Sequence, residues 1–180
     1  MKVLRRVKIK NPTKLKVGDR IKVKLPNESH TATAIKKEED GMLFIFDQFL
    51  DKDHPINKSD TTEGGYEESY MRKFLQELSE EFPEKLKERM IPFDNGDTLQ
   101  LLTIMEVCGV DERLKNCDGQ IPYFKDRRNR IAERKGIDYE CMWTSTVVSG
   151  TSFAIVDSSG LADDHGASLS LGVRPAFKIR

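Results

Sequence analysis

The polar residues best placed for chemistry lie near the end of the chain, in the run Asp163-Asp164-His165-Gly166. Two carboxylates beside an imidazole can hold a cation or bind a polar ligand. We predict that this run belongs to a long loop between the last strands, which would present it to a partner. Calcium held by Asp163 and Asp164 is one alternative. An exposed acidic loop without an ion is favoured over it, so no metal ligand is assigned.

A second polar group, Ser149-Gly150-Thr151, separates two runs rich in Val, Thr and Phe. Residues 150–154 differ by one residue from a nucleophile-elbow pattern, but that device requires a strand that turns into a helix. Because residues 153–156 continue as a strand, we predict a hairpin tip with Ser149 and Thr151 available for binding. The sequence predicts no catalytic residue.

The histidines and cysteines form no recognisable metal or nucleophile motif. His30, His54 and His165 are far apart in the sequence and not at ligand spacing from Cys or Glu. The three cysteines lack Cys-x-x-Cys spacing, which favours reduced thiols and synthesis in a cytoplasm: Cys108, Cys117 and Cys141. The run Asp51-Lys52-Asp53-His54 lacks the alternation of a calcium loop, so residues 49–65 are predicted to be a solvated loop without a cofactor.

The sequence predicts one folded domain over residues 1–180, with helices inserted into a mostly antiparallel sheet, an α+β fold. The chain has 30 basic and 30 acidic residues and is 37% hydrophobic, with β-branched and aromatic residues throughout. We divide it into a basic β-rich opening segment (1–46), a helical insert region (66–135) and a closing β-meander (140–180). No signal peptide and no apolar run of about 20 residues is present, so no membrane association is expected.

Alternating apolar residues predict strands over 3–10 and 17–25, then a hairpin of 31–36 with 42–46. Residues 1–25 contain ten Lys or Arg and one acid, whereas residues 36–81 contain thirteen acids and six bases. Lysines on an exposed sheet face keep the edge of the sheet from aggregating. The absence of aromatic residues from 1–40 argues against nucleic acid as a partner. Opposite-sign segments predict a homo-oligomer.

Three helices are predicted between the hairpin and the closing segment. Tyr70, Phe74, Leu75, Leu78 and Phe82 stand at helical spacing. Pro83 begins a short second helix over 83–89, and residues 98–104 are predicted to be a strand. Residues 124–135 are predicted to be a basic surface helix, with Arg127, Arg128, Arg130, Arg134 and Lys135 among its cations.

Trp143 and Arg174 are predicted to be structural. A buried indole needs a partner for its N–H, and Arg174 precedes Pro175, which fixes an extended backbone. Its planar guanidinium can join a carboxylate or several carbonyls. We expect the Trp143 strand and the Arg174-Pro175 strand to lie in one β layer that supports the Asp163-Asp164 loop.

The chain resembles uncharacterised domains of Gram-positive bacteria and their phages that end in Trp-Leu-Arg-Ser and then Gly-Val-Arg-Pro-Ala. The matching residues are Glu68-Ser69-Tyr70-Met71-Arg72-Lys73-Phe74-Leu75, Leu101-Leu102-Thr103 with Glu106-Val107, Trp143-Thr144-Ser145-Thr146 and Gly172-Val173-Arg174-Pro175-Ala176. Thr144 and Ser145 stand where that family has Leu and Arg, so the role of its arginine is not transferred.

The same ending is more distantly similar to the C-type-lectin-like fold of formylglycine-generating enzymes and of phage receptor-binding proteins. The resemblance implies a scaffold that displays binding loops. The enzymes of that fold need copper-binding cysteines near the end of the chain, and Cys141 is the last cysteine here. We therefore expect a non-enzymatic recognition or structural domain, phage-encoded and part of a virion, that binds a protein or glycan. A nucleic-acid-binding protein and an enzyme of unknown reaction are the alternatives.

Overall fold

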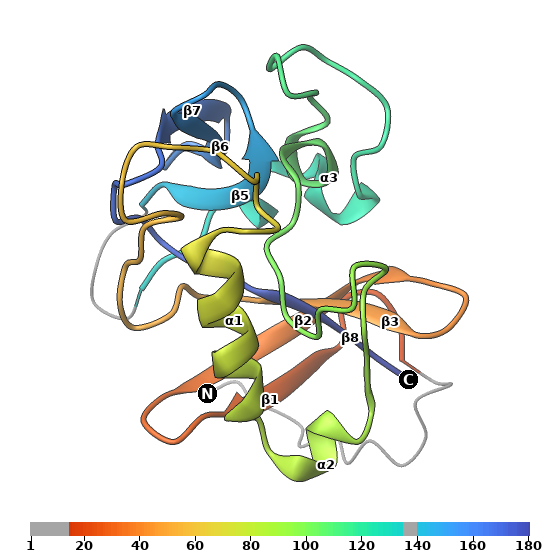
Figure 1. Cartoon of the computed structure of the whole chain (residues 1–180). Helices are drawn as coiled ribbons and strands as arrows, with labels where there is room; N and C mark the ends of the chain where they lie inside the picture. Colours follow the sequence, from red (N-terminus) through yellow and green to blue (C-terminus); the bar gives the residue numbers. More distant parts are fainter. Residues whose placement is uncertain (1–14, 135–139) are drawn as a thin grey trace.

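The computed structural model describes residues 15–134 and 140–180, so the predicted strand over 3–10 lies outside the described residues. Figure 1 shows an α+β arrangement of antiparallel sheets and helices. The strands are β1 (Arg20–Lys24), β2 (Ser29–Lys37), β3 (Met42–Phe46), β4 (Met90–Ile91), β5 (Met142–Val147), β6 (Ser152–Val156), β7 (Ala162–Gly166) and β8 (Ala176–Ile179). The helices are α1 (Tyr70–Glu80), α2 (Glu84–Lys87) and α3 (Ile104–Cys108), with the 3₁₀ helices η2 (Pro122–Lys125) and η3 (Arg127–Asn129).

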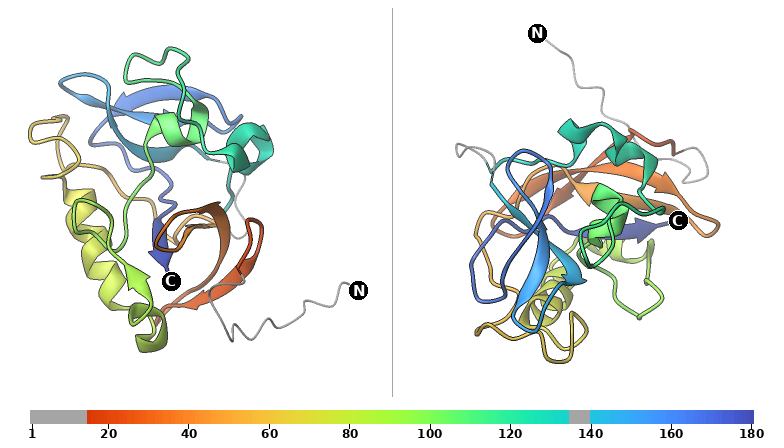
Figure 2. Two further views of the ribbon diagram at one scale, coloured as in Figure 1. Left: turned by 90° about the vertical axis from the view of Figure 1, so that its right-hand side faces the viewer. Right: turned by 90° about the horizontal axis from the view of Figure 1, so that it is seen from above.

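The larger sheet has five antiparallel strands in the order β1-β2-β3-β8-β4. The predicted hairpin is confirmed, because β2 pairs with β3 across the turn at Asp40-Gly41. The strand predicted over 17–25 is also confirmed as β1, with Val23 buried and its lysine neighbours exposed. Figure 2 shows that this sheet is strongly curved, with α1 beside it.

Strand β3 lies between two hydrophobic layers, which explains its uninterrupted apolar sequence. Phe44 and Phe46 pack in one core cluster with Met71 and Leu75 of α1. On the opposite face, Leu43 and Ile45 pack in a second cluster with α3 and η2. Strand β6 contributes to both clusters in the same alternating way, so the smaller sheet is anchored to the larger one.

The closing segment is divided between two sheets, which corrects the prediction of a single meander over 140–180. Strands β5, β6 and β7 form a three-stranded sheet, while β8 pairs with β3 and β4 in the larger one. All four residues of β8 are buried, because both faces of this strand are covered by the core clusters. The Trp143 strand and the Arg174 segment therefore do not share a β layer. They meet where the Trp143 N–H donates to the Gly172 carbonyl over 3.1 Å.

Helix α1 confirms the predicted helical spacing and explains the motif Ser69-x-x-Arg72-x-x-Leu75. The Ser69 hydroxyl caps the helix by accepting a hydrogen bond from the Arg72 N–H over 3.0 Å. The Arg72 guanidinium makes two hydrogen bonds, of 2.8 and 2.9 Å, with the buried carboxylate of Asp97, and Leu75 is fully buried. Each residue of the motif thus has a structural role.

Two predicted elements are wrong. Residues 98–104 are not a strand, because Thr103 forms a capping box with Glu106 and starts α3 at Ile104. The basic helix predicted over 124–135 is replaced by η2 and η3 and by non-helical residues 130–134, while Lys135 lies outside the described residues. Asp126 interrupts the helix, since its carboxylate accepts a hydrogen bond from the Arg128 N–H and caps η3. The predicted second helix is confirmed as α2, capped by Pro83.

Candidate functional site

Three segments distant in sequence are joined by hydrogen bonds at the end of the smaller sheet. We call residues 57–65, 149–151 and 166–169 the loop cluster. Thr62 is the centre of the first contact, since its hydroxyl donates to the Ser149 carbonyl over 2.7 Å and its N–H donates to the Gly150 carbonyl over 3.1 Å. The long loop is thereby fixed to the predicted hairpin tip.

Asp60 and Ala167 complete the loop cluster. One Asp60 oxygen accepts hydrogen bonds from the Ser168 N–H and hydroxyl, over 2.9 and 2.7 Å. These two bonds lower the pKa of the exposed Asp60 carboxyl, so it is a carboxylate at neutral pH. The Ala167 N–H donates to the Thr151 carbonyl over 2.9 Å, and the Asn57 N–H donates to the Ala167 carbonyl over 3.0 Å.

Ser149 and Thr151 lie at the exposed tip between β5 and β6. The Ser149 hydroxyl accepts hydrogen bonds from the N–H groups of Thr151 and Ser152, which form a tight turn. The Thr151 side chain is exposed, while its N–H donates to the Ser149 hydroxyl and its carbonyl accepts the Ala167 N–H. The tip is therefore a fixed polar surface.

Asp163, Asp164 and His165 are placed differently from the prediction. They belong to β7 and pair with Ile155, Ala154 and Phe153 of β6. Their polar composition resembled a loop, but a sheet edge tolerates polar side chains because one side of the strand faces solvent. Adjacent strand residues point to opposite faces, so Asp163 and Asp164 do not direct two carboxylates at one calcium ion.

Trp143 and Arg174 are buried and bonded to backbone carbonyls. The Trp143 indole N–H donates to the His54 carbonyl over 2.9 Å. The Arg174 guanidinium donates to the carbonyls of Phe46 and Asn129, over 2.6 and 2.8 Å. Burial lowers the pKa of Arg174 to about 10, so it is still a cation at neutral pH. The Pro175 carbonyl accepts the Phe46 N–H over 3.0 Å, which joins the end of β3 to the start of β8.

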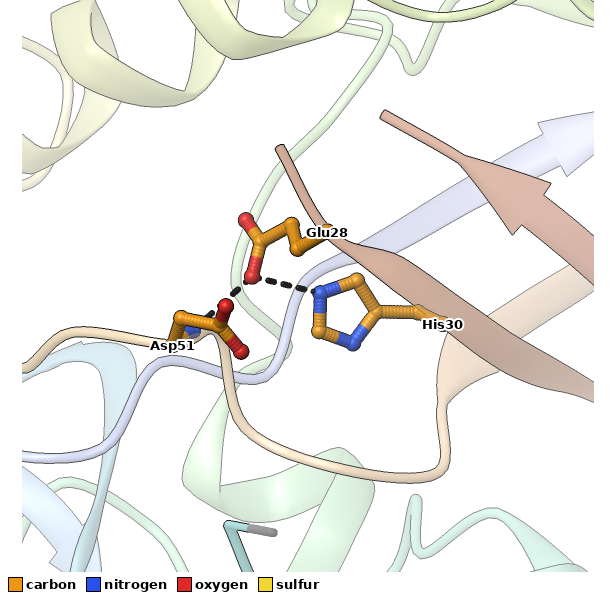
Figure 3. Close-up of side chains that lie close together, drawn as sticks. All are labelled: Glu28, His30 and Asp51. Atoms are coloured by element: carbon orange, nitrogen blue, oxygen red, sulfur yellow. Dashed lines mark hydrogen bonds and ion pairs between the residues drawn. The ribbon is translucent and has the colours of Figure 1, made fainter. Parts of the chain in front are cut away.

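A second polar group, which sequence analysis missed, contains Glu28, His30 and Asp51 (Figure 3). Glu28 precedes β2, His30 lies within it, and Asp51 follows β3. One ligand-type atom from each residue lies within 4.8 Å of the other two. Among the residues that the structure describes, this is the one such group of three or more His, Cys, Asp or Glu side chains.

The loop that carries Asp51 is fixed on both sides of this residue. The Leu50 N–H donates to the Val173 carbonyl over 3.0 Å, and the His54 N–H donates to the Leu171 carbonyl over 3.1 Å. Glu28 contributes a third bond, because its carboxylate accepts the Asp51 N–H over 2.9 Å. Asp51 is therefore held beside Glu28 by its backbone, while its side chain is exposed.

Glu28 contacts both other members of this group, and these contacts set the pKa of its carboxyl. Burial by itself raises the pKa of its carboxyl, but the contact with the His30 ring and the hydrogen bond from the Asp51 N–H outweigh burial and lower it. Glu28 is thus an anion at neutral pH. The spacing Glu28-x-His30 was the one local signal of this group, because Glu28 stands two positions before His30, directly ahead of β2. Asp51 joins them only through the tertiary fold.

Two cations of the predicted basic helix, Arg130 and Arg134, bind partners within the protein, whereas Arg127 and Arg128 are exposed. The Arg130 guanidinium donates to the carbonyls of Phe124 and Gly160 over 2.8 and 3.2 Å. Arg134 pairs with Asp53 and Glu140. These two cations are therefore less available to a nucleic acid than the sequence indicated.

The three thiols are free, and the pKa of each is raised, first by desolvation. A nucleophilic cysteine needs a lowered thiol pKa.

Among the described residues, no helix has the length and apolar character required to cross a membrane.

The architecture defines an α+β domain in which a curved five-stranded sheet carries a small three-stranded sheet and its loops. Residues 40–180 match the model of DUF6273, a domain of unknown function, so the chain belongs to the DUF6273 family. The loop cluster and Asp51 lie within the matched region, whereas Glu28 and His30 precede it. No curated protein and no solved structure matches the chain.

Proposed function

We propose that this protein is a non-enzymatic recognition domain that binds a protein or a glycan through the loop cluster. The observation that carries the proposal is the direct hydrogen bonding of residues 57–65, 149–151 and 166–169 to one another. Loops fixed before binding lose less conformational entropy when a ligand arrives. Loops that are fixed in advance therefore favour a role in ligand recognition.

The side chains of the loop cluster suit a polar ligand with some apolar surface. Asp60 is an exposed carboxylate, and the hydroxyl of the exposed Thr151 can donate or accept hydrogen bonds, while Ser149 holds the turn that presents it. Leu169 is 47% exposed beside Ser168 and adds an apolar contact. Carboxylates, hydroxyls and an apolar side chain on one surface can bind either a sugar or a protein loop.

The C-type-lectin-like scaffold and a place in a phage virion stay predictions. Their support is the resemblance of the closing residues 172–176 and the display of loops by a small antiparallel sheet. A gene neighbourhood that encodes tail or capsid proteins would support the virion role.

Substitution of Thr151 by arginine tests the recognition surface. The purified full chain is screened on a glycan array and against host lysate, and the affinity of each selected ligand is then measured. We expect Thr151→Arg to weaken binding by at least about tenfold, because the long side chain covers the hairpin tip of the loop cluster. The backbone hydrogen bonds of residue 151 do not involve the substituted side chain, so the fold should be unchanged.

Glu84→Arg is the matched control, because Glu84 is exposed in α2, at the far end of the molecule from the smaller sheet (Figure 1). It adds the same side chain and should leave the affinity unchanged. Equal affinities for Thr151→Arg and the wild type would contradict the proposed surface. Turnover of a small molecule by the wild type would contradict the non-enzymatic assignment.

A further inference from the structure

We propose that Glu28, His30 and Asp51 bind one divalent transition-metal ion of the Zn²⁺ type. This site is separate from the loop cluster and does not depend on the recognition function. It combines one imidazole nitrogen with two carboxylates, a set that fits Zn²⁺ and leaves a coordination position for water or a ligand.

The buried ring of His30 is the first step of the argument. Its side chain is 3% exposed, and within the described part of the chain neither ring nitrogen has a hydrogen-bond partner of acceptable geometry. Glu28 Oε2 lies 2.8 Å from His30 Nε2, so this close oxygen is out of line with an N–H on that nitrogen. A buried polar atom without a partner calls for an unseen water or ion.

The ring of His30 is also held in place. It stacks on Phe46, with ring centroids 4.9 Å apart and planes inclined by 25°. Its Nε2 faces the Glu28 carboxylate (Figure 3). An imidazole held by stacking, with one nitrogen close to a carboxylate but in no linear hydrogen bond with it, is arranged in advance for an ion.

The separations of the three side chains fit a shared ion after a small movement. Two ligands about 2.1 Å from one ion lie roughly 3 to 3.5 Å apart. The Glu28–His30 distance of 2.8 Å is slightly below this range, and all three ligand atoms lie within 4.8 Å of one another. Asp51 is exposed, so its side chain can rotate toward the ion while its N–H remains bonded to Glu28.

The ligand chemistry selects the ion. Calcium takes six to eight oxygen ligands, whereas this site offers a nitrogen from an almost fully buried imidazole. Imidazole nitrogen favours Zn²⁺ and its first-row neighbours. Calcium should therefore compete poorly for the site.

The test is a Zn²⁺ titration of the full chain after removal of metals with a chelator, followed by calorimetry and by the shift in melting temperature. We expect one Zn²⁺ per chain and a raised melting temperature. Glu28→Gln and Asp51→Asn should each weaken Zn²⁺ binding by at least about tenfold, on the scale of losses at metal sites. Both substitutions keep a side-chain oxygen, and Glu28→Gln can still accept the Asp51 N–H, so the fold is preserved.

Asp163→Asn is the matched control, since it removes an exposed carboxylate in β7 and should leave Zn²⁺ affinity unchanged. Substitution with Co²⁺ tests for thiolate ligands, and an absorption spectrum without near-ultraviolet thiolate charge-transfer bands is expected. Failure to bind Zn²⁺, thiolate bands with Co²⁺, displacement of Zn²⁺ by equimolar Ca²⁺, or unchanged affinity in Asp51→Asn would overturn the assignment.

Discussion

Replacement of Trp143 by alanine is expected to reduce the free energy of unfolding by about 3–5 kcal/mol, the range for removal of a large buried aromatic side chain. Trp143 is 2% exposed and packs in the core cluster shared by the two sheets. Its indole N–H also holds the His54 carbonyl over 2.9 Å. Because Trp143 is the one tryptophan of the chain, unfolding must be followed by far-UV circular dichroism.

Trp143→Phe separates the two contributions of this residue. It keeps an aromatic ring in the core but loses the donor to His54. The His54 carbonyl retains a hydrogen bond from the Leu171 N–H over 3.3 Å, so the donor itself should contribute only about 1 kcal/mol. We expect Trp143→Phe to lose less than half as much stability as Trp143→Ala. Equal losses would show that the hydrogen bond, not burial, dominates.

Arg174→Met is the second large effect that we expect, with a loss of about 2–4 kcal/mol in the free energy of unfolding. It leaves the carbonyls of Phe46 and Asn129 without the donor that now serves both, and each unsatisfied buried group costs about 1–3 kcal/mol. Removal of a fully buried cation returns part of its desolvation penalty. The net loss should therefore lie in the lower half of the sum. Urea unfolding measures it.

Arg174→Lys and Arg128→Met are the controls for that measurement. Lysine keeps the charge, but its single ammonium cannot match the planar guanidinium that reaches two carbonyls, so an intermediate loss is expected. Arg128 is exposed in η3, and its change to methionine should stay within about 0.5 kcal/mol. An Arg174→Met protein with the same free energy of unfolding as the wild type would refute the structural role of Arg174.

Elements fixed by local sequence were predictable. Helix α1 follows from its apolar spacing, and the β2–β3 hairpin follows from alternation around Asp40-Gly41. The start of α3 was also readable, because Thr103 and Glu106 form the capping box Thr-x-x-Glu. That signal was missed because the apolar run 99–104 resembles a strand.

The partition of the strands between two sheets was not predictable in the same way. Strand β8 pairs with β3, more than a hundred residues earlier, and no local pattern specifies such a partner. Strand β7 was missed for a related reason, because Asp163 and Asp164 lower its β propensity while pairing with β6 imposes the strand. In both cases tertiary pairing decides the structure.

The candidate sites likewise combine features that local sequence predicts with contacts that only the tertiary fold creates. Ser149 and Thr151 were predicted at a hairpin tip from the turn residues around Gly150, and the structure places them there. Their connection to Thr62 and Asp60 arises only when the chain folds. Glu28 and Asp51 are likewise 23 positions apart, so their contact could not be inferred from spacing.

Amide hydrogen exchange, followed by NMR on the full chain, tests most directly whether the loop cluster is formed before any ligand binds. The N–H groups of Asn57, Thr62 and Ala167 donate to carbonyls of other segments, whereas Gly150 is exposed at the hairpin tip and provides a fast reference. We expect the first three amides to exchange as slowly as those within β6. Exchange of all three at the rate of Gly150 would contradict a preformed recognition surface.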